Sequence, residues 1–307
     1  MNKWIKPLGL LFLIVFVCSI MVRVLSGSET LDEYAIKNPE LAYATPEKQW
    51  EENVSPTATP SFTPSPAPSP TPSAASLTVP EVETADSVHY QDGFFYQPLT
   101  DSVKARITGI SYPVSESVAP ALSVEAVNIM NDSDSPAVSY DDLCYMNVLY
   151  YDFNGEVQIG ELICNKKIAQ DLIEIFYELY LNEYRIEKIR LIDEYGGDDT
   201  ASMEDNNTSC FNYRVVDGTS SLSKHALGCA IDINPFYNPY IVFDKNGSGE
   251  DYISPKGSEI YADRSQNFPY KIDENDLCYK LFKEHGFTWG GNWNSCKDYQ
   301  HFQKVVE

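Results

Sequence analysis

The sequence predicts an α+β fold in which helices pack on a small antiparallel sheet. Residues 145–153 form a strand-like run that ends at Asn154-Gly155, a dipeptide typical of β-hairpins, and residues 156–163 supply the return strand. Residues 166–182 then place apolar side chains three and four positions apart, as an amphipathic helix does. A second helix is predicted over residues 277–285.

The segments around these elements are less regular. Residues 94–112 are mixed and mostly strand-like, and residues 186–192 alternate as a strand does. Residues 196–208 are interpreted as a polar loop, and residues 235–265 as a long loop that borders a cleft. Asn165 is placed to cap the first helix.

Composition divides the chain into four parts. Residues 1–7 are a short basic N-terminus, and residues 8–25 are apolar apart from Arg23. This run is short for a membrane span, which needs about 20 residues, but no small-residue cleavage motif follows it. We therefore favour an uncleaved signal-anchor with a cytoplasmic N-terminus over a cleaved signal peptide. Residues 26–84, rich in Pro, Ser and Thr, predict a disordered linker, and residues 85–307 predict one exported domain.

Charge and cysteine content narrow the choice of partners. The formal net charge is -23, and a nucleic-acid-binding protein needs a basic surface, so nucleic acid is excluded as a partner. Six of the seven cysteines lie outside the apolar N-terminal segment, and their disulfide pairing is not fixed by sequence: Cys144, Cys164, Cys210, Cys229, Cys278 and Cys296. The first two face each other across the predicted hairpin if its loop has an odd number of residues.

Two short stretches carry the residue types of a catalytic zinc site. His225 and Asp232 are seven positions apart, with Gly228 between them to permit a tight bend. His301, close to the C-terminus, adds a second imidazole. Two imidazole nitrogens and one carboxylate oxygen suit Zn²⁺ and leave a fourth position open for water.

Local patterns place these ligands on regular elements. Residues 230–233 alternate as a strand, so Asp232 is expected on the face opposite its apolar neighbours. Residues 299–302 are also strand-like, and His301 projects from them. Asp298 lies three positions before His301, where it can reach a water at the metal without being a ligand. That is the position of a general base.

These motifs resemble those of the D-alanyl-D-alanine carboxypeptidase family of zinc peptidases, whose fold is shared with the hedgehog signalling domain. The resemblance rests on Ser-x-His-x-x-Gly-x-Ala-x-Asp at 223–232, Trp-Gly-Gly-x-Trp at 289–293 and Asp-x-x-His-Phe at 298–302. It runs from about Tyr96 to Gln303. The most similar subgroup includes L-alanyl-D-glutamate endopeptidases, in which the catalytic carboxylate is Asp.

The resemblance assigns a role to each residue of the candidate site. It implies that the Zn²⁺ ligands are His225, Asp232 and His301 and that the catalytic base is Asp298. It matches Arg214 to an arginine that binds substrate carboxylate or steadies an oxyanion, and Ser223 to a serine near the substrate. The alternative interpretations are a surface or ion-paired arginine and a turn or cap serine.

The implied function is that of a zinc-dependent D-alanyl-D-alanine carboxypeptidase-type metallopeptidase that hydrolyses peptidoglycan stem peptides in the bacterial cell wall. Its expected location is the cell membrane, with a single span and an extracellular catalytic domain, or outside the cell if the signal is cleaved. Two alternatives stay open. One is an L-alanyl-D-glutamate endopeptidase of the same family. The other is a non-catalytic, zinc-containing cell-wall binding module, which would have no need of Asp298.

Overall fold

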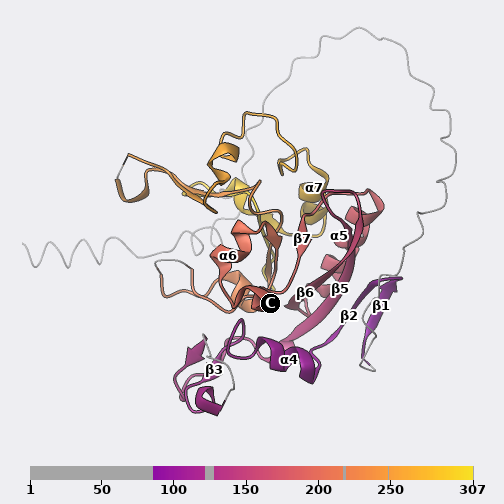
Figure 1. Ribbon diagram of the computed structural model, residues 1–307, viewed down its shortest axis with the longest axis vertical. Helices are drawn as coiled ribbons and strands as arrows, with labels where there is room; N and C mark the ends of the chain where they lie inside the picture. Colours follow the sequence, from indigo (N-terminus) through magenta and orange to yellow (C-terminus); the bar gives the residue numbers. More distant parts are fainter. Residues whose placement is uncertain (1–85, 122–127, 217–218, 248, 307) are drawn as a thin grey trace, which may run out of the picture. The chain divides into compact units, whose positions relative to one another are not determined.

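The computed structural model of the chain describes residues 86–121, 128–216, 219–247 and 249–306 (Figure 1). The predicted membrane segment and linker lie outside these residues. Within the described part, no helix has the length and apolar character that crossing a membrane requires. The described residues combine four α-helices with small, mostly antiparallel sheets, which confirms the predicted α+β class.

The predicted hairpin is the longest β-structure in the described residues. It consists of β5 (Leu143–Tyr151) and β6 (Val157–Asn165). Five residues connect the strands, because Tyr151 is opposite Val157, and Gly155 among them has a φ of 84°. This odd loop length sets Cys144 opposite Cys164, as expected, with the two Sγ atoms 3.5 Å apart.

The hairpin extends into a four-stranded antiparallel sheet. Its order is β1 (Val88–Gln91), β2 (Phe94–Pro98), β5, β6. Side chains alternate between its two faces, and each face has its own apolar core. The larger core includes Met146 and Leu162 and lies under α5 (Ala169–Leu181). The smaller core, which includes Tyr145 and Ile163, lies on the α4 side of the sheet.

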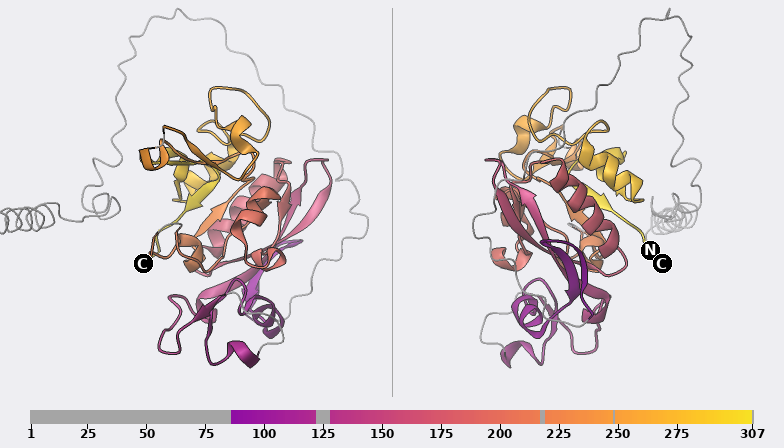
Figure 2. Two further views of the ribbon diagram at one scale, coloured as in Figure 1. Left: turned by 60° about the vertical axis from the view of Figure 1, so that its left-hand side comes forward. Right: turned by 90° about the vertical axis from the view of Figure 1, so that its right-hand side faces the viewer.

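Two helices cover the larger core. α5 packs across β5, and α7 (Leu277–Glu284) packs beside α5 (Figure 2, right). α7 ends at Glu284, with His285 as its C-cap and Gly286 next at a φ of 80°, close to the predicted boundary. α5 begins three residues later than predicted, because the side chain of Asn165 accepts the amide hydrogen of Lys167 (3.1 Å) in a turn that precedes the helix.

Two helices occupy segments where none was predicted. α4 (Asp101–Ile107) lies within the stretch expected to be strand-like, and the side chain of Thr100 caps it. α6 (Asp199–Glu204) lies within the expected polar loop, and the side chain of Asp198 caps it. Each cap accepts an amide hydrogen from the first turn, which stabilises a short helix that has no apolar period of its own.

The strand predictions for the middle of the chain also need correction. Of the stretch expected to be a strand at 186–192, only β7 (Lys188–Ile189) is one, and it pairs in parallel with β8 (Asn207–Thr208). The expected long loop at 235–265 contains a hairpin of β10 (Tyr240–Val242) and β11 (Tyr252–Ser254).

The C-terminal strands form two further three-stranded antiparallel sheets. One has the order β12 (Thr288–Trp289), β14 (His301–Gln303), β9 (Ala230–Asp232). The other adds β13 (Lys297–Asp298) to the β10–β11 hairpin. The remaining elements are the parallel pair β3 (Val114–Ser115) and β4 (Ile129–Met130) and the 3₁₀ turns η1 (Ala119–Ala121), η2 (Tyr140–Asp142), η3 (Ile192–Tyr195), η4 (Lys224–Leu227), η5 (Lys245–Gly247), η6 (Ser258–Tyr261) and η7 (Gly290–Asn292).

Candidate metal centre

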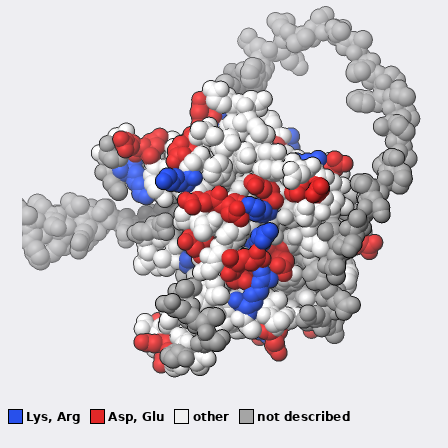
Figure 3. Space-filling model, in the orientation of Figure 1, with Lys and Arg blue, Asp and Glu red and all other residues white. Residues whose placement is uncertain are grey.

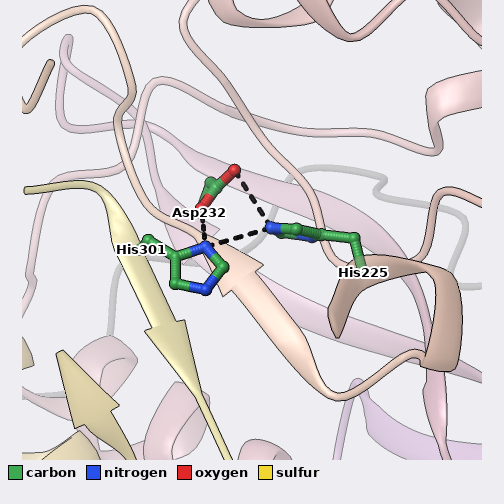
Figure 4. A group of neighbouring side chains, drawn as sticks. All are labelled: His225, Asp232 and His301. Atoms are coloured by element: carbon green, nitrogen blue, oxygen red, sulfur yellow. Dashed lines mark hydrogen bonds and ion pairs between the residues drawn. The ribbon is translucent and has the colours of Figure 1, made fainter. Parts of the chain in front are cut away.

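Two of the predicted ligands lie opposite each other on neighbouring strands. His301 on β14 is the register partner of Asp232 on β9, so their side chains leave the sheet on the same face (Figure 4). The alternate residues Ile231 and Phe302 enter the larger apolar core. The prediction that Asp232 points away from its apolar neighbours is therefore confirmed.

The third predicted ligand comes from a 3₁₀ turn beside β9. His225 lies in η4, whose first turn is capped by the Ser223 side chain and which ends at Gly228 with a φ of 66°. A Cβ at this glycine would come within 2.6 Å of the Asn165 backbone nitrogen. The glycine thus lets the chain turn back against the hairpin and run directly into β9.

The three side chains converge on one point. The Nε2 atom of His225 lies 3.2 Å from Nδ1 of His301 and 3.3 Å from a carboxylate oxygen of Asp232. The other carboxylate oxygen is 3.0 Å from His301 Nδ1. Each residue can offer one ligand atom to a common ion, with these atoms within 4.8 Å of one another, and all three residues are buried. No other such group of His, Cys, Asp or Glu occurs among the described residues.

The outer nitrogen of each imidazole faces an oxygen acceptor. Nδ1 of His225 lies 2.6 Å from the carbonyl oxygen of Cys210, and Nε2 of His301 lies 3.0 Å from Oε1 of Gln303. Because both oxygens can accept, each outer nitrogen can donate its hydrogen, which leaves the inner nitrogen available to a metal. This is how histidine ligands of metals are oriented in proteins.

This donor set fits a zinc ion. The two inner nitrogens and the carboxylate oxygens lie 3.0 to 3.3 Å apart, so one cation can contact all three residues. Ligand atoms about 2.05 Å from an ion at tetrahedral angles lie about 3.3 Å apart, which is close to the observed separations. The residues predicted from sequence therefore form a group able to hold a divalent metal.

Electrostatics also favour positive charge at this point. Burial alone would raise the pKa of Asp232, but the neighbouring imidazoles of His225 and His301 hold it well below its usual range. Burial alone would lower the pKa of His301, but the hydrogen bond and charge of Asp232, with Asp298 nearby, raise it to about 9.

Asp298, the predicted base, lies beside the three ligands on β13. One of its oxygens is 4.0 Å from Nδ1 of His301, too far for a hydrogen bond. Its other oxygen, Oδ1, is buried and has no hydrogen-bond partner. Burial raises the pKa of this carboxyl to about 7, and the charge of Asp232 adds to the rise while His301 opposes it. A buried carboxylate with an unused oxygen and a pKa near neutrality suits proton transfer.

The two predicted substrate residues already have partners in the described residues. An Nη2 nitrogen of Arg214 lies 2.7 Å from a carboxylate oxygen of Asp199, on α6, so the arginine is ion-paired. The Ser223 hydroxyl accepts the amide hydrogen of His225 at 3.2 Å and acts as a cap. These contacts match the alternative interpretations of both residues, and their roles toward a substrate stay predictions.

Three contributors to the site are not predicted from the sequence. Gln303 is two positions after His301 on a strand, so it shares the histidine's face, and that spacing is a usable signal. Asp199 lies on α6, in a segment that the sequence predicts to be a polar loop. Cys210 contributes only its backbone carbonyl, which no side-chain pattern reveals.

Comparison with known proteins tests the predicted family. No curated protein and no solved structure is similar enough to the chain to count as a match. The sequence profile of a family described as D-alanyl-D-alanine carboxypeptidase matches residues 217–304. That segment contains the three converging residues and Asp298, but not Arg214 or the β5–β6 hairpin. The family predicted from the motifs is thus confirmed: residues 217–304 of this chain match the D-alanyl-D-alanine carboxypeptidase family of zinc peptidases.

Proposed function

We propose that the chain is a zinc-dependent peptidase that hydrolyses stem peptides of bacterial peptidoglycan. The observation that carries the proposal is the convergence of His225, Asp232 and His301 beside a buried carboxylate with an unused oxygen, Asp298. When bound, a zinc ion polarises the scissile carbonyl and lowers the pKa of water. The family match supports peptide hydrolysis, and the peptidoglycan substrate extends that likeness.

The chain's own residues supply positioning and proton transfer. The outward hydrogen bonds of the two histidines fix their rings, so that their inner nitrogens and Asp232 hold the ion. Asp298, whose Oδ2 lies 4.0 Å from His301 Nδ1, takes a proton from the attacking water and delivers it to the leaving amine. Arg214 donates to an acceptor on the substrate through the nitrogens that Asp199 does not occupy.

Two scissile bonds fit this chemistry. A carboxypeptidase removes the terminal D-alanine, whereas an endopeptidase cuts between L-alanine and D-glutamate. The ion pair between Arg214 and Asp199 does not separate the two reactions, because both substrates carry a carboxylate near the scissile bond. The non-catalytic binding module ranks below both enzymes, since Asp298 would serve no purpose in it. We also propose that the domain shares the fold of the hedgehog signalling domain.

The proposal includes a location. An exported domain carried by an anchor at residues 8–25 and a linker at residues 26–84 would reach peptidoglycan at the outer face of the cell membrane. These residues lie outside the described part of the structure, and the support for this location is their composition.

The test compares the full-length chain with its Asp298→Ala variant. Each is loaded with zinc, assayed for metal content, incubated with a stem pentapeptide muropeptide, and analysed by mass spectrometry. We expect both proteins to bind metal and only the parent chain to cleave, with the variant slower by about 10²- to 10⁴-fold, the usual contribution of a general base. Loss of one alanine indicates a carboxypeptidase, and release of the peptide beyond L-alanine indicates an endopeptidase. Bound zinc without cleavage by the parent chain would refute the enzyme.

A further inference from the structure

The Asp199–Arg214 ion pair joins a helix to the edge of the metal centre. The two side chains are 29% and 22% exposed for Arg214 and Asp199, respectively, and lie 2.7 Å apart. Beyond this contact, Nε of Arg214 is buried without any hydrogen-bond partner. A ligand cannot reach this buried atom, but the partly exposed remainder of the side chain can donate to one.

Contacts on both sides place this pair at the rim of the centre. The Arg214 carbonyl accepts the amide hydrogen of Ser223, two residues before the ligand His225. Asn212 donates its amide hydrogen to the His225 carbonyl, and its side chain lies 3.5 Å from Asp199.

The helix that carries Asp199 also reaches the other half of the centre. On α6, Met203 Sδ lies 3.4 Å from Nε2 of Gln300, the residue that precedes the ligand His301. Gln300 is 3% exposed, and its Oε1 has no partner. α6 and Arg214 therefore border the place where a substrate would lie.

The charge of the Asp199–Arg214 pair limits which substrate groups Arg214 can bind. Asp199 already balances the guanidinium, and Asp232 and Asp298 add two carboxylates that would balance a divalent ion. A substrate carboxylate at the exposed part of the guanidinium would bring a further negative charge next to Asp199, and like charges at such a distance disfavour each other. The charge of the whole molecule has the same sign: the chain carries a net charge of -23, and acidic side chains spread over the face of the described residues shown in Figure 3. An uncharged carbonyl oxygen can accept a hydrogen from the exposed part of the guanidinium without that repulsion.

We propose that Asp199 is a specificity-determining residue, which holds Arg214 and sets it to donate a hydrogen bond to an uncharged carbonyl or carboxamide oxygen of the peptide in place of a free carboxylate. This inference rests on the proposed function. An Arg214 held in this way would favour substrates that are cut at an internal bond or whose carboxylates near that bond are amidated. Asp199 acts through Arg214, so removing its charge should restore affinity for a carboxylate.

Binding to an inactive protein tests the proposal without turnover. The full-length, zinc-loaded Asp298→Ala variant is titrated by calorimetry with three forms of the stem pentapeptide: free carboxylates, an α-carboxamide at D-glutamate, and a C-terminal amide. We expect at least one amidated form to bind about tenfold more tightly than the free form, the size of one hydrogen bond to a charged group. Adding Asp199→Asn should reduce this preference to about twofold or less, chiefly by strengthening binding of the free form.

Two further variants separate specificity from folding. Arg214→Ala should remove the preference as well, and combining it with Asp199→Asn should add nothing, since both changes act on one contact. Glu204→Gln removes an exposed carboxylate from the same helix and should leave the preference intact. The inference fails if the free form binds as tightly as both amides, if Asp199→Asn leaves the preference unchanged, or if no form binds. Cleavage by the parent chain without any preference would retain the proposed function and refute only this inference.

Discussion

The hairpin sheet and the metal centre are built in opposite ways. β5 and β6 are nine residues long each, and the apolar face of α5 covers them. The strands that carry the site are two or three residues long, and their order depends on residues far apart in the chain. Long strands with an apolar face hold themselves together, whereas such short strands need side-chain hydrogen bonds to stay in register.

The distribution of buried polar groups follows this division. Only a few buried polar residues, such as Asn147, belong to the hairpin sheet and its neighbours, and most lie between Ser202 and His301. Several of these act as connectors. Asn234, for example, accepts the Glu187 amide hydrogen and donates to the Arg185 carbonyl. The lesson is that the sheet derives its stability from apolar burial, while the centre derives its order from polar contacts and, when bound, the metal.

The largest difference between the two regions should appear on metal binding. Zinc that binds only the folded chain raises the free energy of unfolding by about 4 kcal/mol at a thousandfold excess over its Kd. His301→Ala removes one of three ligands, so we expect the bound zinc and this increment to disappear. Urea unfolding with and without zinc, together with metal analysis, measures both.

A second histidine serves as the control for that experiment. His285 caps α7 and contacts Asp171, away from the ligands. His285→Ala should keep the full zinc-dependent increment, although its stability without metal falls. An increment that survives in His301→Ala would show that the metal binds elsewhere.

The next prediction concerns the sheet alone. Leu172 on α5 is fully buried in the larger core, and Leu172→Ala should lower the free energy of unfolding by about 3 kcal/mol through lost burial and the cavity left behind. The zinc-dependent increment should not change. Leu181, on the same helix but 54% exposed, provides the matched control, because Leu181→Ala should cost less than about 0.5 kcal/mol. A lost zinc increment in Leu172→Ala would mean that the two regions are not independent.

Sequence alone predicts the hairpin and the ligands because both have local signals. A hairpin turn between two strand-like runs needs no long-range information, and neither does the run from His225 to Asp232. His301 is 69 positions from Asp232, so no local pattern brings the two together. Their place in one metal site is predicted through the motif resemblance. The register between β14 and β9 then confirms that the residues meet.

The remaining parts are missed for identifiable physical reasons. α4 and α6 have seven and six residues, too few to show an apolar period, so their caps are their main signals. The partner of Arg214 is on an element missed for that reason, and the pairing is made only by the tertiary fold. The β10–β11 hairpin is missed because its three-residue strands resemble loop sequence.

A smaller effect is expected where a side chain orients a ligand. Gln303 holds the outer nitrogen of His301 at 3.0 Å, and Gln303→Leu removes that acceptor. Loss of such partners weakens metal binding by about 10- to 100-fold. A competition titration against a zinc-sensitive dye measures the change. Gln303→Glu keeps an acceptor and should retain most of the affinity, so equal affinity in the Leu variant and the parent chain would contradict this role.

The last prediction concerns the seam between the two regions, which is the contact between α7 and the residues that follow α5. Asp276 caps α7 and accepts from the Tyr184 hydroxyl at 3.0 Å, behind α5. Burial raises the pKa of this carboxyl to about 6, although its hydrogen bonds oppose the rise. The folded chain thus holds the proton more tightly than the unfolded chain. The stabilisation from Asp276 is therefore complete below pH about 4 and is lost as the pH rises through about 6.

Asp276→Asn isolates this contribution, because asparagine keeps the cap and does not titrate. The difference in free energy of unfolding, parent chain minus variant, should decrease steadily from pH 4 to pH 7. Urea titrations with chelator present measure it without interference from the metal ligands. A difference that stays constant across this range would show that folding does not change the pKa of the Asp276 carboxyl. Water would then reach the seam. A decrease in this difference would show that the contact between α7 and Tyr184 is dry, as the apolar core under the sheet is. The boundary between the two regions would then lie between α7 and β14.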